Sequence, residues 1–237
     1  KTIEKQFDTY TSELYELASR LDQLKRPVII YIGGAPGTGK SMLATSLATR
    51  LGINKVISTD SIREIMRLAF SNDLLPTLFH STTEAWKGLP MEFQSSEQLI
   101  AGYCLQANQV SLGVRAVVER TVEEGENLIV EGAHLVPFLH EIAKKEMVDA
   151  YHIPITLSIM NEKHHRERFS ERGTKNLRKI ENFYLERFDG IRSIHEYTLT
   201  QCETDEVEVF DNEDLDETLN LIIQFSIQRL FKQVNSE

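Results

Sequence analysis

The chain has 237 residues, 41% of them hydrophobic and 26% charged, with a formal net charge of −10. This balance is typical of one globular domain with a buried core, and so acidic a chain disfavours non-specific nucleic-acid binding. No apolar stretch approaches the roughly 18 residues of a membrane span, and no signal peptide is visible. Two cysteines without a C-x-x-C pair predict neither a disulfide framework nor a zinc site. We expect a cytoplasmic protein that binds neither nucleic acid nor a membrane.

Residues 1–26 carry apolar side chains at alternating spacings of four and three, which predicts an N-terminal amphipathic helix. Pro27 ends this helix. The apolar stripe either packs on the core of its own chain or forms the seam of a homodimer. Residues 27–237 are predicted to form a single further unit.

From residue 28 onward, predicted strands and helices alternate. The strands are expected at 28–32, 55–58, 128–131, 152–159 and 207–210. The helices are expected at 40–51, 62–70, 97–124, 137–146 and 214–232, with two more in 161–200, broken near Gly173, and residues 71–96 irregular. This alternation predicts an α/β fold with a parallel sheet and helices on both faces. Ligands of such folds bind at the carboxyl ends of the strands.

A phosphate-binding motif, G-x-x-x-x-G-K-S, lies between the first predicted strand and the first helix. Its backbone N–H groups and the following helix N-terminus favour phosphate oxygens. Lys40 is expected to reach the β- and γ-phosphates of ATP, and the Ser41 hydroxyl to bind Mg²⁺. The alternative is a glycine-rich turn. The predicted nucleotide site consists of Gly34, Ala35, Pro36, Gly37, Thr38, Gly39, Lys40, Ser41 and Met42.

Two acidic residues stand at the ends of predicted strands, at the same sheet edge as the phosphate loop. Asp60 follows the second strand, where it can accept the proton of an attacking hydroxyl or hold a Mg²⁺ water; its alternative role is a helix cap. Glu131 ends the third strand, where it can hold the metal through water. Gly132 follows instead of a second acid, which favours transfer to a bound acceptor over hydrolysis.

Basic residues near these acids suit an anionic acceptor. Arg63 and Arg67 share a helix face with Asp60, and guanidinium groups bind phosphate and carboxylate bidentately; the alternative is a solvated face. Residues 163–179 hold seven Lys or Arg against two Glu, which predicts a closing lid over 163–183 or, alternatively, a surface patch. Arg172 is the candidate catalytic arginine of the lid. The adjacent His164 and His165 are expected to be solvated, and His134 is either a turn residue or a substrate contact.

Several strings resemble one family, the archaeal 2-phosphoglycerate kinases. They are VISTDSIREIMR at 56–67, PTLFH at 76–80, EAWK at 84–87, EGAHLVP at 131–137 and HRERF at 165–169, followed by a helix similar to that of the family at 184–194. The resemblance covers about residues 28–230. It implies a P-loop kinase fold with a helical substrate-region insertion at 71–124 and a lid. It also implies transfer of the ATP γ-phosphoryl group to 2-phosphoglycerate, giving 2,3-bisphosphoglycerate.

The resemblance implies a small anionic acceptor bound by several cations. The predicted acceptor site combines Arg63, His80, Ser81, Lys87 and Arg115. Two departures from the family pattern, an additional Phe79 and Ala133 in place of a bulkier residue, leave other acceptors such as a nucleoside or a sugar as an alternative. A non-catalytic ATP-sensing regulatory protein is a further alternative, and Asp60 speaks against it because a sensor needs no base beside the γ-phosphate.

Overall fold

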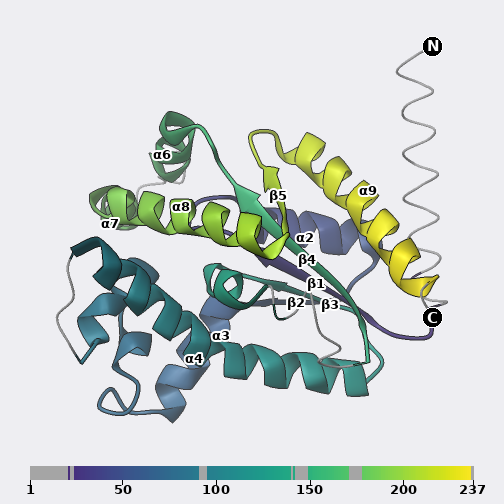
Figure 1. Cartoon of the computed structure of the whole chain (residues 1–237), viewed down its shortest axis with the longest axis horizontal. Coiled ribbons are helices and arrows are strands. Elements are labelled where there is room, and N and C mark those ends of the chain that lie inside the picture. Colours follow the sequence, from purple (N-terminus) through teal and green to yellow (C-terminus); the bar gives the residue numbers. More distant parts are fainter. Residues whose placement is uncertain are drawn as a thin grey trace.

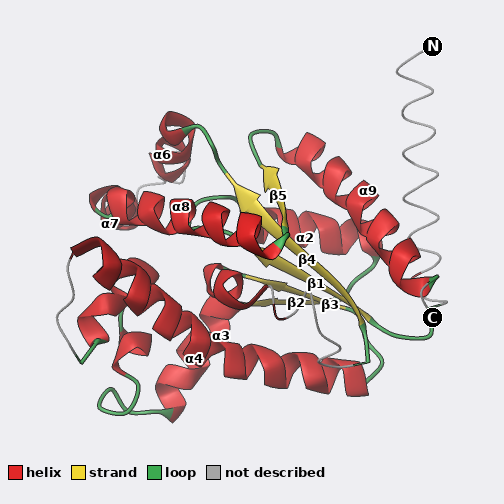
Figure 2. Cartoon of the chain, viewed as in Figure 1, coloured by secondary structure: helices red, strands yellow, loops and turns green. Residues whose placement is uncertain are grey.

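The computed structural model describes residues 21, 24–90, 95–139, 141, 149–170 and 178–235. Its centre is a five-stranded parallel sheet in the order β2-β3-β1-β4-β5, which confirms the predicted α/β class (Figures 1 and 2). The strands are β1 (Val28–Gly33), β2 (Lys55–Ser58), β3 (Leu128–Glu131), β4 (Tyr151–Ser158) and β5 (Glu208–Asp211). Because all strands run the same way, the ends of β1, β2 and β3 meet at one edge, where ligands of such folds bind.

Helices cover both faces of the sheet, and alternate residues of β1 point to opposite sides. Ile30 and Ile32 pack in one buried cluster with α2 (Lys40–Leu51) and α9 (Leu215–Val234). Ile29 and Tyr31 pack in a second cluster with α3 (Thr59–Ala69) and α4 (Ser95–Glu123). Figure 1 shows α4 and α9 on opposite sides of the strands. A strand buried on both faces explains the continuous apolar run of β1.

Most element boundaries lie within two residues of their predicted places, and three differ more. α3 begins three residues earlier than predicted, because the Ser58 side chain caps it by accepting a hydrogen bond from the Ser61 N–H. A short 3₁₀ helix, η3 (Ala133–Phe138), overlaps the first two residues of the helix predicted at 137–146, and most of that predicted helix lies outside the described residues. The second helix predicted in 161–200 is divided at Arg187 into α7 (Arg178–Glu186) and α8 (Phe188–Asp205).

The described part of the predicted insertion, residues 71–124, contains two 3₁₀ helices and α4. The short helices are η1 (Pro76–Phe79) and η2 (Thr82–Gly88), and both contact α4. Gly102 of α4 permits this packing, because a Cβ there would lie 2.4 Å from the Trp86 Cα of η2. The insertion is therefore held on the same face of the sheet as α3, next to the ends of β2 and β3.

The predicted lid, residues 163–183, is described in part, as α6 (Glu162–Ser170) and the first residues of α7. The helix predicted over residues 1–26 lies mostly outside the described residues. Leu21 and Leu24 are described, and they pack against the cluster formed by α2 and α9. The homodimer through residues 1–26 stays a prediction. Within the described ranges, no helix is both long and apolar enough to span a membrane.

Candidate active site

The phosphate loop connects β1 to α2 and takes the backbone shape that its glycines allow. Gly34, Gly37 and Gly39 all have positive φ, and Gly39 forms the N-terminal end of α2 in the left-handed region. The Lys40 side chain is buried, and its Nζ donates to the Ala35 carbonyl at 2.8 Å. The lysine amine therefore lies inside the turn of the loop, at the start of a helix whose N-terminus attracts anions.

Side chains with oxygen atoms lie beside the N-terminus of α2. The Ser41 hydroxyl donates to Oε1 of Glu131 at 2.9 Å, so the end of β3 contacts the first turn of α2. Glu131 is 7% exposed. Asp60 lies in the first turn of α3 with its side chain 66% exposed, and it is not the cap, since Ser58 has that role. An exposed carboxylate next to the phosphate loop is free to meet a substrate hydroxyl.

Arg63 connects Asp60 to the insertion. Its Nε lies 3.8 Å from Oδ1 of Asp60 and has no hydrogen-bond partner, although that nitrogen is buried. Its Nη1 donates to the His80 carbonyl, and its Nη2 donates to Glu64 at 2.8 Å. The guanidinium is thus held in place by two hydrogen bonds, while its buried Nε is left without one. Arg67, on the same helix face, pairs with Glu64 and covers the Phe79 ring.

One cavity of about 350 Å³ joins these groups. Residues predicted to form the site line it together with residues that were not predicted as site residues. Predicted liners are Pro36, Gly37, Gly39, Lys40, Ser41, Asp60, Arg63, Ser81 and Glu131. Additional liners are Thr82, Thr83, Ala133, Phe183, Tyr184 and Ile191. Hydroxyls from the insertion and rings from α7 therefore complete a site whose acids and cations come from the sheet edge.

Lys87 and the His80 side chain, both predicted acceptor contacts, do not line this cavity. Lys87 Nζ pairs with Glu84 at 2.6 Å. Glu84 also accepts from Arg187 at 3.1 Å and from the Ser81 hydroxyl. These partners, Arg187 foremost, lower the pKa of Glu84 to about 2. Glu84 therefore connects the turn that carries Ser81 to Arg187, the residue before α8, and His80 contributes its main-chain carbonyl.

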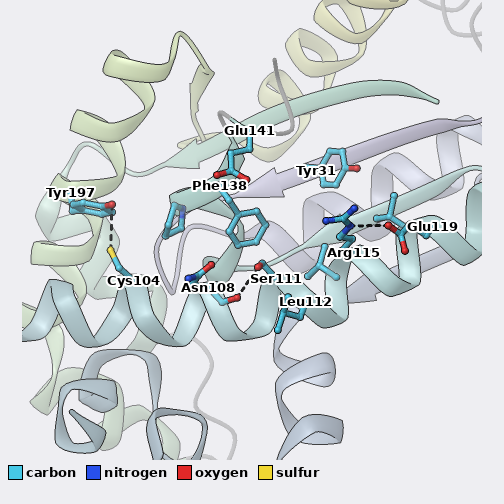
Figure 3. A pocket seen from close by; sticks show the side chains of 13 residues that line it. Tyr31, Cys104, Asn108, Ser111, Leu112, Arg115, Glu119, Phe138, Glu141 and Tyr197 are labelled. Carbon is cyan, nitrogen blue, oxygen red and sulfur yellow. Dashed lines mark hydrogen bonds and ion pairs between the residues drawn. The ribbon is translucent and has the colours of Figure 1, made fainter. Parts of the chain in front are cut away.

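Arg115, the fifth predicted acceptor residue, lies in a different place. It is on α4, where its Nε pairs with Glu119 at 2.8 Å, and it lines a separate cavity of about 470 Å³ (Figure 3). Phe138 and Tyr31 line the same cavity. The structure therefore does not bring Arg115 together with Arg63 and Ser81. Arg172 lies outside the described residues.

The expectation that His165 is solvated is wrong. His165, on α6, is fully buried, and its Nε2 lies 2.9 Å from the Pro36 carbonyl of the phosphate loop. Its Nδ1 lies 3.3 Å from Nη1 of Arg192. Burial first, and the nearby Arg192 charge, lower the pKa of His165 to about 4 although the Pro36 bond opposes the shift. The Phe169 ring packs beside His165 and also against Gly37 of the phosphate loop. A Cβ at Gly37 would lie only 2.3 Å from this ring. α6 therefore packs directly on the phosphate loop.

The fold and the site define a P-loop kinase, an enzyme that transfers a phosphoryl group from ATP. A family described as "AAA domain" matches residues 30–189. Two curated relatives match nearly the whole chain. The 2-phosphoglycerate kinase of Methanopyrus kandleri is 37% identical over 98% of this chain and 70% of its own. That of Pyrococcus furiosus is 39% identical over 94% of this chain and 72% of its own. The chain belongs to the 2-phosphoglycerate kinase family.

A solved structure supports the fold alone. A gluconokinase from Sinorhizobium meliloti superposes with a TM-score of 0.51 at 13% sequence identity, covering 89% of this chain and 99% of the other. The parallel sheet with its flanking helices is therefore shared with a small-molecule kinase of low sequence similarity.

Proposed function

We propose that this protein transfers the γ-phosphoryl group of ATP to the free hydroxyl of 2-phosphoglycerate, giving 2,3-bisphosphoglycerate. The observation that carries the proposal is the single cavity shared by the phosphate loop, Asp60, Arg63 and the hydroxyls of residues 81–83. Its volume of about 350 Å³ suits a small ligand. The identity of the acceptor is inferred from the two relatives, which are named 2-phosphoglycerate kinase.

Each group has a role that follows from its chemistry. Lys40 stabilises the charge on the β- and γ-phosphates. Asp60 accepts the proton of the acceptor hydroxyl as the oxygen attacks phosphorus. The guanidinium of Arg63 and the hydroxyl of Ser81, which both line the cavity, bind the phosphate or carboxylate of the acceptor. Because the site holds the acceptor against the γ-phosphate, it favours transfer over hydrolysis.

Mg²⁺ fits the oxygen donors at the start of α2. The Ser41 hydroxyl and the Glu131 carboxylate are 2.9 Å apart, and Asp60 lines the same cavity. Among the described residues, no group of three or more His, Cys, Asp or Glu could hold a metal by itself. This agrees with Mg²⁺, which usually keeps several waters and binds through one or two protein oxygens plus substrate phosphates. Bound there, the ion would neutralise charge on the phosphates of ATP.

The acceptor and the cellular location are parts of the same proposal. A small anionic partner suits the cationic groups at the cavity. Cys104 and Cys202 are both free thiols, which suits a reducing compartment such as the cytoplasm.

Radiolabelled ATP offered with a panel of acceptors tests the proposal. We expect label in a product only with 2-phosphoglycerate, and little with 3-phosphoglycerate, a nucleoside or a sugar. A site built to pair a phosphate and a carboxylate rejects ligands that lack either, because its cations would be left unpaired. Efficient labelling of a nucleoside or sugar, with none of 2-phosphoglycerate, would contradict the acceptor.

A further inference from the structure

A buried histidine lies between the predicted base and the insertion. His134, on η3, is fully buried and lines neither of the two cavities described above. Its Nδ1 lies 2.8 Å from the Thr59 hydroxyl, and its Nε2 lies 3.1 Å from Oε1 of Gln106 on α4. Thr59 directly precedes Asp60, and Gln106 contacts the turn before Ser81. The ring therefore stands between the two halves of the site.

The direction of each hydrogen bond can be deduced. Nε2 of Gln106 donates to the Thr77 carbonyl at 2.6 Å and to the His80 carbonyl at 3.0 Å, so the amide oxygen faces His134. An amide oxygen only accepts, so His134 Nε2 carries the proton. The ring is neutral, because burial lowers its pKa to about 4 despite the nearby Asp60 charge. Nδ1 is therefore an acceptor, and the Thr59 hydroxyl donates to it.

Two neighbouring features fix this ring. Tyr103, one turn from Gln106 on α4, donates its buried hydroxyl to the Ala133 carbonyl at 2.6 Å. Gly132 has φ of 152°, and a Cβ there would lie 1.8 Å from Thr59 Oγ1. A glycine at this place thus lets Thr59 approach η3 closely enough to reach His134.

The hydrogen bonds from Thr59 through His134 to Gln106 connect two elements of the proposed acceptor site. On one side, Thr59 fixes the first turn of α3 and with it Asp60. On the other side, Gln106 holds the His80 carbonyl, which also accepts from Arg63. We call residues 80–83 the acceptor loop, since Ser81, Thr82 and Thr83 line the cavity.

We propose that His134 is a positioning residue that fixes Asp60 relative to the acceptor loop through its two ring nitrogens. It contacts no substrate itself. The arm from Nδ1 to Thr59 aligns the base, and the arm from Nε2 to Gln106 places the acceptor. The inference rests on the proposed kinase reaction and explains how Asp60 and the acceptor loop are held in fixed positions relative to each other.

Two substitutions of His134 separate the two arms. Asparagine places an oxygen near the position of Nδ1, so His134→Asn keeps the bond from Thr59 and loses the bond to Gln106. Glutamine places an amide nitrogen near the position of Nε2, so His134→Gln keeps the bond to Gln106 and loses the bond from Thr59. Steady-state kinetics with 2-phosphoglycerate and ATP then measure kcat and both KM values. His152→Gln is the matched control, because His152 is a buried histidine that bonds Tyr31 elsewhere on the sheet.

We expect opposite effects from the two substitutions. His134→Asn should raise KM for the acceptor about tenfold or more with kcat little changed, and His134→Gln should lower kcat about tenfold or more with that KM little changed. KM for ATP should stay at the wild-type value in both, and His152→Gln should resemble wild type. Equal changes in the two variants, or wild-type kinetics in both, would overturn the inference.

If the His134 substitutions prevent folding, variants of Thr59 and Gln106, the two partners of the His134 ring, test the proposal instead. Thr59→Val removes one hydroxyl at nearly constant volume and should act as His134→Gln does. Gln106→Met removes the amide and should act as His134→Asn does. Identical kinetic effects of these two variants would contradict separate arms. A wild-type protein inactive on 2-phosphoglycerate contradicts the proposed function, whereas an active wild type whose variants show no such separation contradicts only the role of His134.

Discussion

Three buried histidines should make the folded protein sensitive to mild acid. His134, His165 and His195 are at most 1% exposed, and burial lowers the pKa of each from its ordinary value of 6.5 to about 4. Between these values the unfolded chain binds protons that the folded chain does not. The free energy of unfolding therefore falls as the pH drops through 6.5, and this loss ends below about pH 4.

The size of the effect follows from the shifts. Lowering a histidine pKa from 6.5 to about 4 corresponds to about 3 kcal/mol once the unfolded histidine is fully protonated, and to about 2 kcal/mol at pH 5. Three such groups would together remove about 6 kcal/mol between pH 8 and pH 5, a large part of the 5–15 kcal/mol that is typical of a folded domain. The interval from pH 8 to pH 5 lies above the pH range in which Glu84 becomes protonated in the unfolded chain. The lowered pKa of Glu84 therefore reduces the free energy of unfolding only at lower pH.

Urea unfolding at pH 8 and pH 5 measures this loss. His195→Gln removes one of the three groups, and its amide oxygen can still accept the Ile159 N–H that Nε2 accepts at 3.3 Å. The variant should lose about 2 kcal/mol less than wild type between the two pH values. Ser226→Ala, a buried substitution without a titrating group, should lose as much as wild type. An unchanged loss in His195→Gln would refute the reasoning.

Three substitutions in the cavity test the assigned roles. Lys40→Ala should abolish transfer without unfolding the chain, and near-normal turnover would show that the loop is not catalytic. Asp60→Asn should lower kcat by about 10²–10⁴-fold with KM for ATP little changed; a parallel loss of ATP affinity, measured by calorimetry, would indicate a role in binding instead. Arg63→Ala should raise KM for the acceptor about tenfold to a hundredfold and leave KM for ATP unchanged, because a hydrogen bond to a charged group is lost; equal increases in both KM values would contradict an acceptor contact.

The sequence indicates where the residues of the predicted nucleotide site lie in the fold. The phosphate loop has its own short motif, and Asp60 and Glu131 are placed by the ends of their strands, since parallel strands bring these ends to one edge. Each of these residues is marked by a short stretch of local sequence. The strand order then places Glu131 beside Ser41, at hydrogen-bond distance.

The acceptor half depends on packing that the sequence does not display. Arg115 lies nine residues beyond Gln106 on α4, which is about 13 Å along a helix axis, so it cannot share the cavity with Arg63. His80 acts through its carbonyl, which residue type does not reveal. His165 is buried because the phosphate loop packs over its face of α6, a contact between segments 129 residues apart.

Phosphorus NMR of the complete reaction tests the central claim most directly. With wild-type protein, ATP, Mg²⁺ and 2-phosphoglycerate, the account predicts that the γ-phosphate signal of ATP decreases while the two phosphate monoester signals of 2,3-bisphosphoglycerate appear. Asp60→Asn should leave the spectrum nearly unchanged over the same time. Release of inorganic phosphate without any new monoester signal would contradict a transferase and indicate an ATPase.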